Sequence, residues 1–289
     1  MRYKCKWLIF LPLMFLVACA STPQEDFGTE FTIDELKQRA EVASYAGSHR
    51  DALWNYMQIL AKTPDDTDAL NGAGESLLAA DEAKRAENYF GRVLRLNPLN
   101  TRAREGRALS WLLQGRYAAA QKSLLNLVDD DVDHWRVWNA LGIISDIFGE
   151  YSNSVTHYKR AISLSQDRAM LQNNLGYSLT MNRDFAAAEE VFLKALKLAP
   201  SNPRIVNNLA LSIAWQGRYD EAIQHLGLAM DEASANNNVG YVAYLNEQYD
   251  DAENMFRKAM RISPIFYKRA ATNLELTLNK KNQSRRDKE

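Results

Sequence analysis

Cysteine is almost absent from this chain of 289 residues, which holds only Cys5 and Cys19. Two cysteines near one end exclude a framework of several disulfides and a cysteine-based metal site in the rest of the chain. Proline and glycine are also scarce, with 7 and 13 residues, which favours helices over many short strands. The formal net charge is only −1 and no basic stripe is present, so nucleic acid is not expected as a partner.

Motifs for catalysis are missing as well. The sequence has no Gly-x-Ser-x-Gly, no His-Glu-x-x-His and no phosphate-binding glycine loop. The histidines share no common spacing; they are His49, His134, His157 and His225. We therefore expect a protein that is not an enzyme and that holds no metal and no small-molecule substrate. The alternative from another class is an enzyme or regulatory subunit that depends on His157 or Asp146.

One acidic run, residues 129–133, has the composition of a calcium loop. Such a loop needs a glycine at its sixth place and a glutamate at its twelfth, but His134 and Ala140 stand there. We interpret the run as a solvated turn that also supplies an N-cap to the next helix.

The N-terminus has the pattern of a targeting segment. Arg2, Lys4 and Lys6 precede an apolar run over residues 7–18, which is too short to span a hydrocarbon core of about 30 Å. The run ends in Leu16-Val17-Ala18-Cys19 and resembles a bacterial lipobox. The resemblance implies a signal peptide over 1–18, diacylglycerol and N-acyl lipid (palmitate) on Cys19, and a polar tether over 19–32. Ala20 after the cysteine favours the outer membrane, with the chain facing the periplasm; the alternative is an uncleaved anchor.

A small residue recurs at a fixed interval along the chain. The positions are Ala40, Gly74, Ala108, Gly142, Gly176, Ala210 and Gly240, with five steps of 34 residues and a last step of 30. Such a period indicates a repeat array, with one unit that has lost about a turn. The predicted units lie near 33–66, 67–100, 101–134, 135–168, 169–202, 203–232 and 233–266, followed by a capping helix over 267–279 and a polar tail over 280–289.

Each unit reads as two amphipathic helices joined by a short turn. In the fifth unit, Leu171, Leu175 and Leu179 form one apolar face, and Phe185, Ala188 and Phe192 begin the second, at spacings of three and four. Gly115, Gly149 and Gly217 occupy equivalent turns, where a helix end favours positive φ. We expect the small residue of each unit to mark a close approach between its two helices.

The repeat resembles the tetratricopeptide repeat. The match is clear in Trp138, Leu141, Gly142, Tyr151, Tyr158 and Ala161, and in Gly240, Tyr249, Ala252, Phe256, Ala259 and Pro264. It is weaker in the first three units. The resemblance implies an all-α, right-handed α-solenoid of about seven helix pairs that binds other proteins, with the first helix of each pair lining an inner groove.

Several side chains at the groove-facing places of that family are amides and aromatic rings. They are Asn139, Asn173, Asn174, Tyr177, Asn207, Asn208, Trp215, Asn237, Asn238, Tyr241 and Tyr244. An amide both donates and accepts hydrogen bonds, so a row of amides suits a peptide backbone. The alternatives are that the asparagines at 174, 208 and 238 serve packing, and that Tyr177, Trp215 and Tyr241 belong to the core between repeats.

Residues 135–275 resemble more narrowly the TadD family, the tetratricopeptide lipoproteins of tight-adherence (Flp) pilus assembly. The carrying stretches are 172–179, 207–212, 216–223, 237–243, 256–259, 263–264 and 267–274. This resemblance implies a pilotin-like factor that helps an outer-membrane secretin to localise or assemble during secretion. The alternatives are a type IV pilus pilotin and a scaffold for periplasmic envelope enzymes.

Overall fold

The structure is a computed structural model that describes residues 31–263 and 267–286. The predicted signal peptide, Cys19, most of the tether and Pro264 lie outside these residues. Every regular element in the described part is an α-helix. None of these helices is long and apolar enough to cross a membrane.

The helices follow one another in antiparallel pairs joined by short turns. The first helices of the pairs are α1 (Ile33–Tyr45), α3 (Thr67–Ala79), α5 (Thr101–Leu113), α7 (Trp135–Ile147), α9 (Ala169–Met181), α11 (Pro203–Trp215) and α13 (Glu232–Leu245). The second helices are α2 (His49–Lys62), α4 (Ala83–Leu96), α6 (Tyr117–Asp129), α8 (Tyr151–Leu164), α10 (Phe185–Leu198), α12 (Tyr219–Leu226) and α14 (Tyr249–Ile262). A last helix, α15 (Lys268–Arg286), packs against α14 and α13. The predicted all-α solenoid is confirmed.

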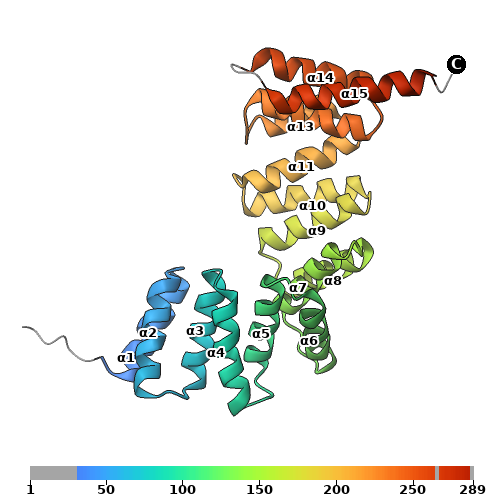
Figure 1. Cartoon of the computed structure of the whole chain (residues 1–289). Helices are drawn as coiled ribbons and strands as arrows, with labels where there is room; N and C mark the ends of the chain where they lie inside the picture. Colours follow the sequence, from blue (N-terminus) through green and yellow to red (C-terminus); the bar gives the residue numbers. More distant parts are fainter. Residues whose placement is uncertain (1–30, 264–266, 287–289) are drawn as a thin grey trace, which may run out of the picture.

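The pairs stack into an elongated, curved array (Figure 1). Helices α1 to α5 stand side by side in its lower part, the chain turns through α6 to α8, and α9 to α15 are stacked above them. Each first helix contacts the next first helix, from α3 through α5, α7, α9 and α11 to α13. The first helices therefore form one continuous wall of the array.

The turns follow the predicted chemistry. Gly115, Gly149 and Gly217 have φ of 73°, 75° and 80° after the first helices of their pairs, so the left-handed helix ends are confirmed. The predicted N-cap from the acidic run is wrong. His134 occupies the N-cap position of α7, and its side chain makes no hydrogen bond to the backbone of that helix. Asp133 instead accepts hydrogen bonds from Trp138 Nε1, at 2.9 Å, and from Arg160.

The close approach predicted at the small residues is confirmed. A Cβ atom built on Gly176 would lie 2.6 Å from the Phe192 ring, and one built on Gly142 would lie 2.6 Å from the Tyr158 ring. Both rings are buried, and each lies sixteen residues after its glycine. A contact this short leaves no room for a side chain on the first helix, because protein interiors are close-packed.

Two lengths differ from the repeating pattern. Helix α12 has 8 residues where α10 and α14 have 14, so the missing turn of the sixth unit falls in its second helix. At the C-terminus α15 continues to Arg286, past the expected cap end at 279. Lys281 Nζ lies 2.8 Å from Glu253 Oε2 of α14 and also pairs with Asp250, which holds the last turns of α15 on the array.

We expect Gly176→Leu to lower the free energy of unfolding by about 1–3 kcal/mol or more, because the new side chain overlaps the Phe192 ring. Urea unfolding followed by circular dichroism measures the change. Gly91→Ala in α4 is the matched control: its new Cβ meets only the end of Arg95, at 4.0 Å. The control should gain about 0.5–1 kcal/mol from helix propensity, and equal effects in the two variants would contradict the packing argument.

Candidate functional site

The wall of first helices is hollowed near its C-terminal end. This C-terminal hollow has a volume of about 580 Å³ and lies between α11, α13 and α15. Its lining residues are Asn207, Leu211, Trp215, Asn237, Asn238, Tyr241, Val242, Leu245, Arg269 and Asn273. The structure thus brings together five of the predicted groove residues, from two repeats and beside the last helix.

Two aromatic side chains of the C-terminal hollow are supported from behind by other rings. Trp215 is half-buried and stacks on Phe185, with ring centroids 5.7 Å apart and an angle of 3° between the planes. Tyr241 is 44% exposed and stacks on Tyr244 at 6.0 Å. Tyr244 lies in turn against Tyr249 and does not line the hollow. Both lining rings are therefore held in place while keeping a face open.

Most of the predicted asparagines bond to one another between repeats. Asn174 Nδ2 donates to Asn139 Oδ1 at 3.1 Å, and Asn208 Nδ2 donates to Asn173 Oδ1 at 3.0 Å. Asn273 Nδ2 donates to Asn237 Oδ1 at 3.1 Å.

These bonds correct the expectation of a row of free amides. Asn173 and Asn237 are only 7% and 2% exposed. A buried amide needs a hydrogen-bond partner, and the neighbouring first helix provides it. These two side chains join repeats, and a peptide would compete with that bonding.

Asn207 is the exception, and the short α12 coincides with it. The residue in α13 that corresponds to Asn174 and Asn208 is Asn238, but Asn238 Nδ2 contacts Met230 Sδ at 3.5 Å. Met230 follows α12 directly, where a full-length helix would have continued. Within the described residues the Asn207 amide makes no hydrogen bond, and it lines the C-terminal hollow. Its donor and its acceptor are both available to a ligand.

The C-terminal helix adds two residues that the sequence pattern missed. Arg269 is exposed, forms no ion pair within the described residues, and is the one charged residue lining the C-terminal hollow. Asn273 closes the hollow beside it. The sequence feature that could have revealed them is the spacing of 36 residues between Asn237 and Asn273. It is close to the spacing of 35 residues between the other hydrogen-bonded asparagines. It marks α15 as a continuation of the wall rather than a cap alone.

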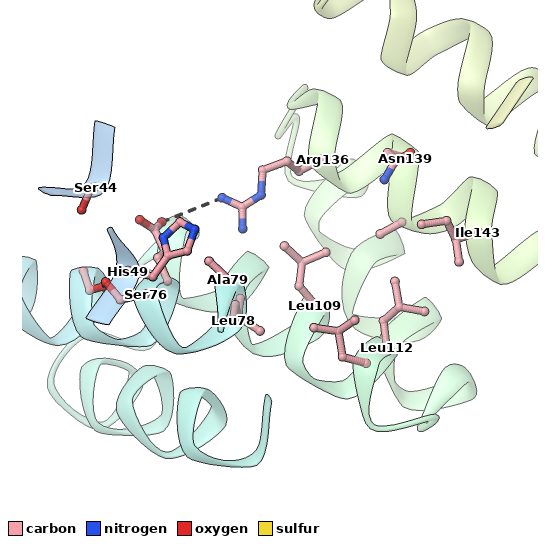
Figure 2. A pocket seen from close by; sticks show the side chains of 14 residues that line it. Ser44, His49, Ser76, Leu78, Ala79, Leu109, Leu112, Arg136, Asn139 and Ile143 are labelled. Carbon is pink, nitrogen blue, oxygen red and sulfur yellow. Dashed lines mark hydrogen bonds and ion pairs between the residues drawn. The ribbon is translucent and has the colours of Figure 1, made fainter. Parts of the chain in front are cut away.

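A second hollow, the N-terminal hollow, lies between α3, α5 and α7 and has a volume of about 480 Å³. Figure 2 shows Leu109, Leu112 and Ile143 beside it, with Arg136 extended across it to the carboxylate of Glu75 at 3.9 Å. Arg136 Nε also lies 3.0 Å from Glu105 Oε1.

Six of the eleven predicted groove residues do not line the C-terminal hollow: Asn173, Asn174, Asn208 and Tyr244, described above, and Asn139 and Tyr177. Asn139 lines the N-terminal hollow. Tyr177 is 43% exposed on α9 and lines neither of these two hollows.

The polar groups that an enzyme would use have structural partners here. Asp146 accepts hydrogen bonds from Tyr158 OH at 2.9 Å and Ser178 Oγ at 2.7 Å. Burial, then the negative charge of Asp146, raises the pKa of Tyr158 well above its usual value, so the phenol stays a donor. Burial lowers the pKa of His157 and favours its neutral form. Among the described residues no three His, Cys, Asp or Glu side chains are placed to hold a metal ion.

Two adjacent asparagines allow the bonded amides to be separated from the free one. Asn208→Ala should lower the free energy of unfolding by about 1–3 kcal/mol, because it leaves the buried Asn173 Oδ1 without its donor. Asn207→Ala should change it by less than about 0.5 kcal/mol. Both changes raise helix propensity equally, so the difference between their urea midpoints reports the lost bond. Equal midpoints would show that the bond between repeats contributes nothing.

Comparison with known proteins identifies the repeat. Models of the tetratricopeptide repeat match residues 74–121, 114–169, 148–203 and 173–237, and a second model of the same repeat matches 233–263. Human tetratricopeptide repeat protein 6 is 27% identical over 163 residues, which are 56% of this chain and 31% of that protein. The chain thus spans less than a third of that relative.

Solved structures agree in fold. A chain of the APC/C hetero-tetramer Cut9–Hcn1 superposes with a TM-score of 0.62 at 18% identity, covering 86% of this chain and 50% of that one. The structure of PilF from Pseudomonas aeruginosa gives 0.55 at 19% identity, covering 74% and 97%. At sequence identities this low, the two superpositions show a shared fold and nothing about function. Because the repeat models together span residues 74–263, the chain belongs to the tetratricopeptide repeat family, whose α-solenoids are typically non-catalytic scaffolds for protein–protein interaction.

Proposed function

We propose that this chain is a lipid-anchored scaffold that holds an extended segment of a protein partner in its C-terminal hollow. The observation that carries the proposal is the unpaired amide of Asn207, placed in one hollow with the open faces of Trp215 and Tyr241. A peptide unit needs one donor and one acceptor, and Asn207 offers both. The two rings offer apolar contact area at little cost in side-chain entropy, because other rings already fix them.

The single charge of the hollow adds a preference. Arg269 has no ionic partner within the described residues, and its guanidinium carries five donors. We expect a bound segment to present a carboxylate or a group of carbonyl oxygens towards Arg269 and an apolar side chain towards Trp215 and Tyr241.

The partner that we propose is an outer-membrane secretin or another component of tight-adherence (Flp) pilus assembly. The support is the resemblance of residues 135–275 to the TadD family together with the lipobox ending in Cys19. A lipid on Cys19 would fix the array to the periplasmic face of the outer membrane. Anchor and hollow on one chain raise the local concentration of a partner in the same membrane.

Two equivalent tyrosines test the site. Tyr241→Ala should weaken capture of the secretin about tenfold, because it removes a lining ring of the C-terminal hollow. Tyr177→Ala is the matched control: it holds the same place in α9, is 43% exposed and lies outside both hollows. Capture is measured by co-purification with the secretin from detergent-solubilised membranes. Equal capture by the two variants would remove the C-terminal hollow from the proposal, and no capture by the unchanged chain would remove the secretin.

Cys19→Ser tests the anchor separately. This variant should incorporate no labelled palmitate, because the thiol is the group that takes the diacylglycerol, and it should be lost from the outer-membrane fraction. The described fold begins at residue 31, so the melting temperature of the array should not change. Membrane retention of the variant at the level of the unchanged chain would contradict lipidation.

A further inference from the structure

The first helix pair exposes an apolar surface at the N-terminal end of the array. We call this surface, formed by α1 and α2, the N-terminal face. It carries Val42, Tyr45, Trp54 and Met57, which are 62%, 93%, 50% and 45% exposed. The end repeats of a solenoid normally present polar outer faces, because no further repeat covers them. An apolar end face indicates that something else does.

A third hollow, the edge hollow, lies on this face between α1 and α2, with a volume of about 510 Å³. Val42, Ala43 and Trp54 contribute its apolar lining. Asn55 also lines it and is only 4% exposed. Asn55 Nδ2 donates to the Asp51 carbonyl at 2.8 Å, but Asn55 Oδ1 has no hydrogen-bond partner. This oxygen is buried and out of reach of a molecule in the hollow, so the edge hollow offers a partner its apolar lining and the charged residues at its rim.

The N-terminal face contains the complement of each of its own features. Tyr45 is almost fully exposed and lies three residues along α1 from Val42, which lines the edge hollow. Arg39 and Asp51 both line the hollow, both are exposed, and neither forms an ion pair within the described residues. A projecting tyrosine, an apolar hollow, a cation and an anion therefore lie on one surface.

We propose that the N-terminal face binds the N-terminal face of a second copy of this chain. In a two-fold pair each contact occurs twice, with residue i on j and j on i. Tyr45 of each copy enters the edge hollow of the other and packs on its apolar lining. Arg39 of each copy pairs with Asp51 of the other. A different protein would need to supply all these complements, whereas a second copy has them already.

Photo-crosslinking of the full-length chain in cells tests the pair. A photoreactive benzoyl-phenylalanine replaces Met57 at the rim of the N-terminal face, and two epitope tags on separate copies identify crosslinks between them. The control position is Leu99, which is 76% exposed between α4 and α5. We expect a crosslinked pair carrying both tags from position 57 and none from position 99. A crosslink from 57 to a different protein alone, or no crosslink, would overturn the proposal.

Charge exchange gives the second arm of the test. Arg39→Asp alone and Asp51→Arg alone each place like charges opposite one another, and each should reduce the crosslinked pair several-fold. The double variant carrying both changes should restore it, which no effect on folding of the single copy predicts. Tyr45→Ala should also reduce the pair while leaving the melting temperature unchanged, because Tyr45 is 93% exposed. A double variant as weak as the single ones would contradict the two-fold pairing.

Discussion

The contact between a buried ring on the second helix and a glycine on the first determines the geometry of four helix pairs, through Phe90, Tyr158, Phe192 and Phe256. Phe192 against Gly176 and Tyr158 against Gly142 leave no space for a Cβ atom, so the two helices of a pair are held at one distance. Phe90 extends the same contact to the next pair, because it lies against both Gly74 and Gly106. The second and third pairs are thereby set relative to each other, and contacts between successive first helices continue the wall from α3 to α13.

Hydrogen bonds between asparagine side chains of neighbouring repeats add to this apolar packing. Asn139 with Asn174 and Asn173 with Asn208 repeat one geometry, and Asn237 with Asn273 carries it into α15. The series is interrupted at Asn207, beside the one pair whose second helix has lost a turn. The candidate site thus arises from a local failure of the repeat. Asn207 is an asparagine like Asn139 and Asn173, but the asparagine of the next repeat, Asn238, contacts Met230 and does not bond to it.

The fold was largely predictable because the features that specify it are local and periodic: the small residues, the glycines at helix ends and the apolar faces. The site was less so. A sequence places Asn173 and Asn237 on the wall, but it does not say that a neighbouring helix occupies their oxygens. Arg269 was missed because α15 lies outside the repeat count. The N-terminal hollow was missed because most of its lining comes from the first three units, whose motifs are weakest.

The eight-residue α12 also has a mechanical consequence. A shorter second helix buries less surface against its neighbours than the 14-residue helices around it, so the joint between α11 and α13 bends more easily than it would with a full-length α12. The C-terminal hollow bridges this joint, with lining residues on both sides of it. A segment bound there contacts both sides of the joint and therefore restricts its bending, so binding and stiffening of the array are coupled.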